Sequence, residues 1–237
     1  YALLHLTPVQ NWLVKKVTDN LSEKLHAKIS IRHIDFDFFD KLELKGLYVE
    51  DQYKDTLLYA GSASIKITDW FFLKDKVTLH YVALEDAQVN LSRSKDTVWN
   101  HQFLVDYFGG SKESKDTSGG IDLKLEELKL KNISIRQIDG WKGKDMLVSL
   151  KSLDLVADTF DLKKQIISIS KLDIDTPVFT QRDYTGERDR LGIIPPKKPK
   201  DTTKTQPGGL AISVMNLHIT NGTFNNEAET EQGIYPG

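Results

Sequence analysis

Apolar and polar residues alternate through most of this chain, which is the pattern of β-strands with one face in water. From residue 28 onward the alternation recurs in short segments that polar turns separate. Helical spacing is scarce by comparison. The pattern predicts a mostly β fold, an elongated curved antiparallel sheet with one apolar face, repeat-like and shaped as a groove.

One strand-like block occurs three times, beginning at Leu42, Leu128 and Leu217. In each copy the alternation breaks at the fifth residue, which is Gly46, Asn132 or Asn221, and resumes on the opposite parity. A parity slip of this kind predicts a bulge that bends the strand. Recurrence at a long period predicts an elongated architecture of similar units.

Two segments have helical spacing. Thr7 is a good N-cap before Pro8, and an apolar residue then recurs every fourth position from Val9 to Leu25. This predicts an amphipathic helix that ends near Ala27 and caps one end of the sheet. The alternative is a helix lying on a membrane surface, which the weakly basic polar face does not favour. A short second helix is expected between residues 100 and 108.

Composition shifts divide the chain into six parts. Two stretches rich in Gly, Ser, Lys and Pro have the composition of flexible loops. The expected parts are a helix at 1–27, a first β-groove unit at 28–108, a loop at 109–120, a second β-groove unit at 121–182, a polar loop at 183–209, and the start of a third β unit at 210–237. This organisation is that of a fragment of a longer protein.

The charge balance and the missing cysteines exclude several classes of function. The formal net charge of −2 over 237 residues argues against electrostatic capture of nucleic acid. The absence of cysteine excludes a disulfide scaffold, a thiol nucleophile and a Cys-based zinc site. No apolar run is long enough to span a bilayer.

Candidate catalytic and metal-binding residues are few. The six histidines form no paired ligand motif, so no metal site is expected. Asp35 and Asp37 flank Phe36, and Asp173 and Asp175 are spaced in the same way, which suits cation binding or acid/base work. Carboxylates at such spacing are more often the solvent face of a half-buried strand. No nucleophile or phosphate-binding motif occurs, so we expect no enzyme and no cofactor.

The apolar face is therefore the candidate functional surface. Either two sheets cover each other, as in a sandwich or solenoid scaffold or adhesin, or one sheet curls around something else, such as a lipid chain. Burying a methylene group is worth about 0.8 kcal/mol, so only a continuous apolar trough could hold an acyl chain. The residues expected to line it are Ile34, Phe36, Leu44, Val49, Ile65, Ile67, Val77, Leu79, Val89, Leu91, Leu130, Ile135 and Ile219.

Several segments carry a family resemblance. Pro8–Leu13 followed by Lys28–Ile31, then Leu42–Asp51 and Leu84–Leu91, resemble the N-terminal periplasmic region of TamB/AsmA-like proteins of Gram-negative bacteria. The resemblance is good over residues 6 to 108 and continues to 224 only through the repeat. Its motifs are structural and include no catalytic signature.

The resemblance implies a location and partners. Such proteins are anchored in the inner membrane and span the periplasm with a curled sheet. They are implicated in moving phospholipids, held by their acyl chains, toward the outer membrane. They are also implicated in assembling outer-membrane proteins with an insertase-type barrel. This chain lacks the family's N-terminal anchor and the C-terminal region that contacts the barrel.

Overall fold

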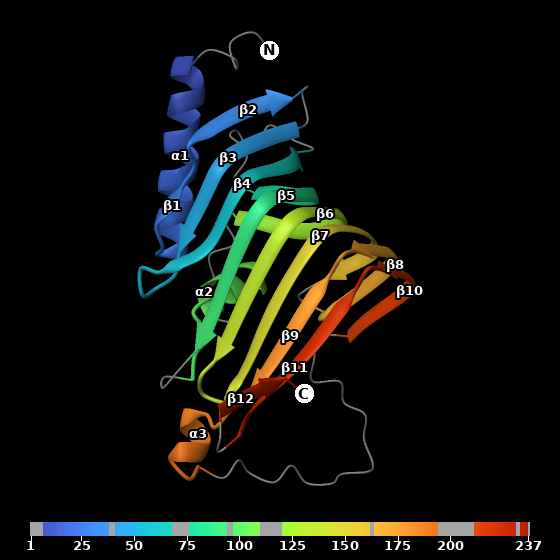
Figure 1. Ribbon diagram of the computed structural model, residues 1–237. Helices are drawn as coiled ribbons and strands as arrows, with labels where there is room; N and C mark the ends of the chain where they lie inside the picture. Colours follow the sequence, from blue (N-terminus) through green and yellow to red (C-terminus); the bar gives the residue numbers. More distant parts are fainter. Residues whose placement is uncertain are drawn as a thin grey trace.

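The described strands form one open, curved sheet (Figure 1). The computed structural model describes residues 7–37, 41–67, 76–93, 97–109, 120–161, 164–193, 211–230 and 233–236. The prediction of a mostly β, curved and open architecture with an N-terminal helix and a short second helix is confirmed.

The elements follow one another in the order shown in Figure 1. They are α1 (Thr7–Leu25), β1 (Ile29–Ser30), β2 (His33–Asp37), β3 (Lys41–Glu50), β4 (Thr56–Ile67), β5 (Lys76–Arg93), α2 (Gln102–Gly109), β6 (Gly120–Asp139), β7 (Lys144–Asp161), β8 (Ile166–Asp175), β9 (Val178–Asp183), α3 (Glu187–Arg190), β10 (Ala211–Thr220), β11 (Thr223–Thr230) and β12 (Gly233–Pro236).

Helix α1 packs its apolar stripe on the first strands. Leu13 and Leu25 are buried, and Leu13 lies in one cluster with Ile34 and Phe36 of β2. The helix ends at Leu25, slightly before the expected Ala27, because His26 adopts the left-handed conformation (φ 50°) that commonly terminates helices. The packing confirms that α1 caps this end of the sheet.

The sheet is mixed, and the expectation of purely antiparallel pairing was wrong. Strands β3, β4 and β5 form an antiparallel meander, and so do β6, β7 and the β8–β9 pair. Where these units meet, β5 pairs with β6 in parallel, and β8 and β9 pair in parallel with β10 and β11. Each unit has three strand lengths and begins in the same direction as the one before it, so its first strand lies parallel to the last strand of the preceding unit.

Parallel joints explain the two long excursions. Strand β5 has 18 residues and is about 60 Å long at 3.3 Å per residue, and the chain must return over that length before β6 begins. The connections therefore run through residues 94–119 and 184–210. Their composition predicted only flexible loops, whereas the parallel pairing requires long connections at these two places.

A transverse fold line crosses the sheet at the predicted parity slips. Gly46, Asn132 and Asn221 have φ of 63°, 53° and 53°, so the bulge expected in each repeat is present. Asp86 and Thr176 are also left-handed. Strand registers place all these positions in one row, in which ladder pairing is interrupted. The fold line consists of Gly46, Gly61, Asp86, Asn132, Lys151, Thr176 and Asn221.

A second line of bulges runs nearer the other strand ends. His80, Asp158, Ser170 and Met215 have no Cα partner in at least one ladder. Along both lines the strands slip parity together, so the apolar side chains stay on one face while the sheet bends. The slips therefore mark where each strand bends, as the sequence predicted.

The expected mobile loop at 183–209 is ordered in its first part. Gly143, in the β6–β7 turn, accepts a hydrogen bond from the Tyr184 amide at 2.8 Å, and a Cβ on Gly143 would lie 1.9 Å from the Tyr184 carbonyl oxygen. Helix α3 follows at once. Phe38, the aromatic cluster Trp70–Phe72 and most of the loop at 109–120 lie outside the described residues.

Candidate functional site

Rows of apolar side chains run across the strands on one face of the sheet. The clearest is the 219 row, in which each residue is the Cα partner of the next. It consists of Ile34, Leu44, Ala63, Leu84, Leu130, Leu153, Ile174 and Ile219. The row crosses eight strands, which at 4.8 Å per strand makes it about 34 Å long.

A second row lies beyond the fold line and is equally continuous. The 224 row consists of Ile29, Val49, Leu58, Val89, Ile135, Val148, Phe179 and Phe224. Phe179 and Phe224 stack with their ring centroids 5.2 Å apart. Between the two rows lie Leu47, Ala60, Ala87, Ile133 and Leu150, four of which form a buried cluster. The three rows make one apolar face.

The structure brings most of the predicted trough residues onto this face. The 219 row contains Ile34, Leu44, Leu130 and Ile219, and the 224 row contains Val49, Val89 and Ile135. Phe36 and Ile65 lie in the neighbouring row through Leu42, and Leu91 lies two residues beyond Val89. Leu79 lies past the second line of bulges. The side chains of Ile67 and Val77 lie outside the described residues.

Burial divides the predicted residues into two groups. Ile34 is fully buried, and Phe36 and Val49 are less than a tenth exposed, because they pack in clusters with Leu13 and Leu25 of α1. They belong to a core beneath the helix. Leu44, Ile65, Val89, Leu91, Leu130 and Ile135 are half-buried. Their role in lining a trough stays a prediction.

Exposure of the apolar face increases toward the C-terminal strands. In the 219 row it rises from 0% at Ile34 to 51% at Ile219, and in the 224 row it reaches 66% at Phe224. The described elements that pack over this face are α1 and α2, with Phe103, Leu104 and Tyr107 of α2 against Leu91 and its neighbours. α1 lies at the β1 end of the sheet, and α2 lies behind β5 and β6 (Figure 1).

No second sheet covers the face within the described ranges, where all twelve strands belong to one sheet. The sandwich alternative is therefore not the architecture of this part of the chain. Sequence reasoning missed Leu84, Leu153, Ile174, Val148 and Phe179 as members of the rows. Their alternation was visible, but the cross-strand register that aligns them was not.

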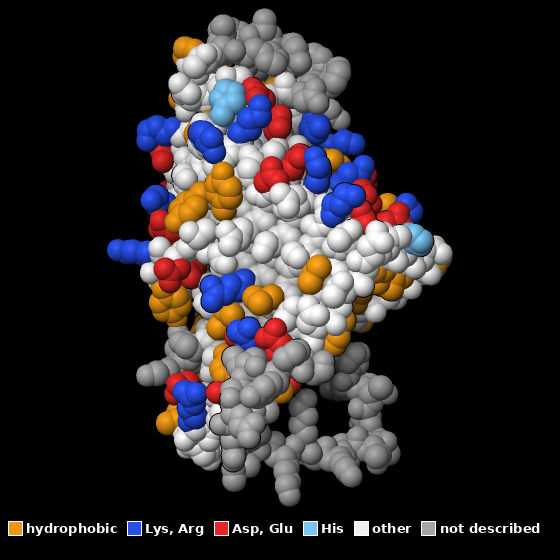
Figure 2. Space-filling model, viewed as in Figure 1, with side chains coloured by type: hydrophobic (Ala, Val, Ile, Leu, Met, Phe, Trp, Pro, Cys, Tyr) orange, Lys and Arg blue, Asp and Glu red, His pale blue; other side chains and the backbone are white. Residues whose placement is uncertain are grey.

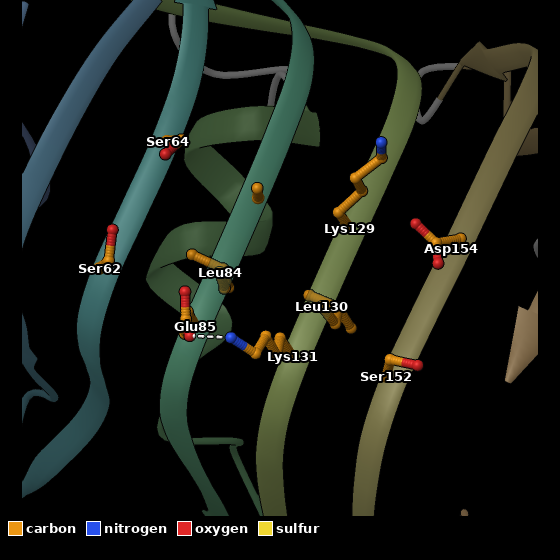
Figure 3. Close-up of a pocket in the computed structure, with 10 residues that line it drawn as sticks. Ser62, Ser64, Leu84, Glu85, Lys129, Leu130, Lys131, Ser152 and Asp154 are labelled. Carbon is orange, nitrogen blue, oxygen red and sulfur yellow. Dashed lines mark hydrogen bonds and ion pairs between the residues drawn. The ribbon is translucent and has the colours of Figure 1, made fainter. Parts of the chain in front are cut away.

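The opposite face is polar. A shallow hollow of about 280 Å³ there is lined by Ser62, Glu85, Lys131, Ser152 and their neighbours on β4 to β7 (Figure 3). Glu85 and Lys131 form an ion pair at 2.5 Å, and Asn132 donates to Asp86 at 2.6 Å. Charged side chains of both signs are interspersed over the sheet (Figure 2). Such paired, exposed charges indicate a solvated surface.

The paired carboxylates singled out in the sequence have ordinary partners. Asp35 accepts a hydrogen bond from Lys45 at 2.9 Å, which together with His33 holds the pKa of Asp35 below its usual value. Asp173 pairs with Lys171. Over the described residues, no three His, Asp or Glu side chains are placed to hold a metal ion. Asp35, Asp173 and Asp175 each form an ion pair with a lysine on the strand surface, and the side chain of Asp37 lies outside the described residues.

Comparison with known proteins adds no relative: no protein-family model and no curated protein matches the chain. Within the described part of the chain, none of the helices has both the length and the apolarity needed to cross a bilayer.

Proposed function

We propose that this chain is a groove segment of a bridge-like periplasmic protein that carries phospholipid acyl chains between the inner and outer membranes. The observation that supports the proposal is the unbroken apolar face, whose rows run across eight strands and over the parallel joint between units. A face used only for core packing would need a covering layer along its whole length. Here the described cover is α1 and α2, and the face is more than half exposed at Ile219 of β10 and Phe224 of β11.

The dimensions of the face suit an acyl chain. Two leaflets of lipid tails span about 30 Å, so one tail occupies about 15 Å, which is half the length of the 219 row. Each methylene group that leaves water contributes about 0.8 kcal/mol, so a chain of about 16 carbons gains roughly 12 kcal/mol from full burial. A continuous row lets the tail move along the sheet without crossing a polar step.

The polar face completes the arrangement. Its paired charges keep the outside of the trough in water while the apolar rows face inward. Support for outer-membrane protein assembly rests on the family resemblance, and we include it in the proposal on that basis. Anchoring in the inner membrane and contact with an insertase-type barrel belong to regions that the family has outside this segment.

Photocrosslinking in cells tests the lipid role. A photoreactive residue replaces Leu153, on the apolar face, and a matched variant carries it at the adjacent Ser152, on the polar face; both positions are half-buried. We expect phospholipid adducts at position 153 well above those at 152. A second pair of variants, at Leu130 on the apolar face and Lys129 on the polar face, repeats the comparison on another strand. Equal capture at both members of each pair would overturn the proposal.

A further inference from the structure

The edge of the sheet at β10 and β11 is only partly occupied. β10 pairs with β8 on one side, and on the other side no described strand pairs with it. β11 pairs with β9 on the first side, and on the second side β12 runs antiparallel along Glu227–Thr230. Along this edge, β11 is therefore paired with β12, whereas no described strand pairs with β10.

In the preceding unit, β6 corresponds to β10 and β11, and its equivalent edge is paired with β7. β6 and the β10–β11 pair share the repeated block, and Asn132 and Asn221 occupy the same place in it with φ of 53°. β7 pairs antiparallel with β6 from Glu127 to Asp139. The pairing crosses the fold line without a change of register. β12 lies on β11 with the orientation that β7 has on β6.

β10 also lacks the features that protect a free edge. The strand contains no Lys, Arg or Pro, and Ile212, Leu217 and Ile219 are each more than half exposed. Natural sheets blunt long free edges with such residues or cover them. At the other end of the sheet, α1 packs on β2, whose Asp35 is paired with Lys45 of β3. The edge at β2 is therefore covered by a helix, whereas no described element covers the edge at β10.

We infer that the free edge of β10 is the docking surface for one further antiparallel β-strand, the continuation of the path of β12. Its apolar side chains face Ile219, Leu217, Val214 and Ile212, so the 219 row gains one more member. The inference rests on strand pairing and holds whether or not the face carries lipid.

A strand graft tests the inference. A copy of residues 147–160 added directly after Gly237 continues β12 in register, so that the copy of Leu153 lies opposite Ile219 just as Leu153 lies opposite Leu130. Hydrogen exchange of the β10 amides is then compared with that of the unmodified chain. We expect exchange to slow by about tenfold or more, because edge amides become ladder donors.

A register-shifted graft is the matched control. One Ser inserted between Gly237 and the copied strand turns its apolar side chains to the polar face, and we expect little protection. Exchange of the β4 and β5 amides, far from the graft, verifies that every variant is folded. If the in-register graft leaves β10 unprotected, or the shifted graft protects it equally, the inference is wrong. Concentration-dependent protection of the unmodified chain, with the mass of a dimer, would assign the edge to a second copy and also overturn it.

Discussion

Arg93 donates from Nε and Nη2 to the two carboxylate oxygens of Asp139, at 2.8 and 2.7 Å. The pair joins β5 to β6 at the end of their parallel ladder, where the chain leaves for its first excursion. The Trp99 ring lies over the guanidinium, 4.8 Å away, and the Lys142 amide donates to Asp139 at 3.0 Å. Burial pushes the pKa of Asp139 upward, but Arg93 and the Lys142 amide together hold it below its usual value. The joint between units is thus locked by a largely buried bidentate ion pair.

Removing one member of this pair is expected to destabilise the fold. Asp139→Asn leaves the Arg93 charge buried without a partner, and we expect the free energy of unfolding to fall by about 3 kcal/mol. Urea unfolding measures it. Asp19→Asn, which breaks the exposed Lys15–Asp19 pair, is the control and should change the same quantity by less than about 0.5 kcal/mol. A similar small effect for both variants would show that the joint does not depend on the pair.

The fold line predicts a strong preference for glycine at position 46. Gly46→Ala places a Cβ 2.8 Å from the Arg32 guanidinium in a left-handed conformation (φ 63°). We expect a loss of about 2 kcal/mol, of which about 1 kcal/mol comes from the backbone conformation. Gly192→Ala has φ 66° and open space around its Cβ, so it isolates the backbone part. Equal losses would mean that the close approach of Arg32 is unimportant.

The packing of α1 on the sheet can be tested by comparing substitutions at two adjacent residues of the helix. Leu13 is 2% exposed in the cluster with Ile34 and Leu42, whereas Trp12 is 55% exposed on the outer side of the helix. Leu13→Ala should lower the free energy of unfolding by about 3 kcal/mol, and Trp12→Ala by less than about 1 kcal/mol. Thermal and urea unfolding both report this difference. The reverse order would mean that α1 does not pack on the sheet in solution.

Acid should weaken the hydrogen bonds that the Asp175 carboxylate accepts beside the fold line. Lys151, then Thr176, Thr220 and Asn221, donate to Asp175 and lower its pKa from 3.8 to about 2. A lowered pKa means that this contribution to stability is complete above pH 3.8 and is lost as the pH falls to about 2. The difference in stability between wild type and Asp175→Asn should therefore shrink over that interval. Lys151→Met should move the carboxyl midpoint, followed by NMR, back toward 3.8; an unmoved midpoint would contradict the assignment.

The parity slips could be found from the sequence because each has a local cause. Gly and Asn tolerate the left-handed conformation, and the alternation on both sides of Gly46, Asn132 and Asn221 shows the change of face directly. The same holds for α1, whose apolar stripe is contained in one segment. For these slips and for α1 the signal lay within one strand or helix, and the prediction was confirmed.

Pairing direction and register were not accessible in the same way. Alternation is identical in parallel and antiparallel strands of such a sheet, so the β5–β6 joint left no mark within either strand. The ladders place Val89 in one row with Phe179, a neighbour that no pattern within either strand indicates. One usable signal was overlooked: parallel neighbours need a connection of about a dozen residues or more, and the connections at 94–119 and 184–210 are long enough.

The odd strand count has a consequence for how such a sheet grows. Three-strand units joined in antiparallel pairing would alternate in direction, whereas the joints here are parallel. Units of three repeat by translation, each about 14 Å further along the sheet. A molecule that slides along the rows would meet the same sequence of positions at every step, always from the same side. Duplicating a unit would then lengthen the path without redesigning any contact already in place.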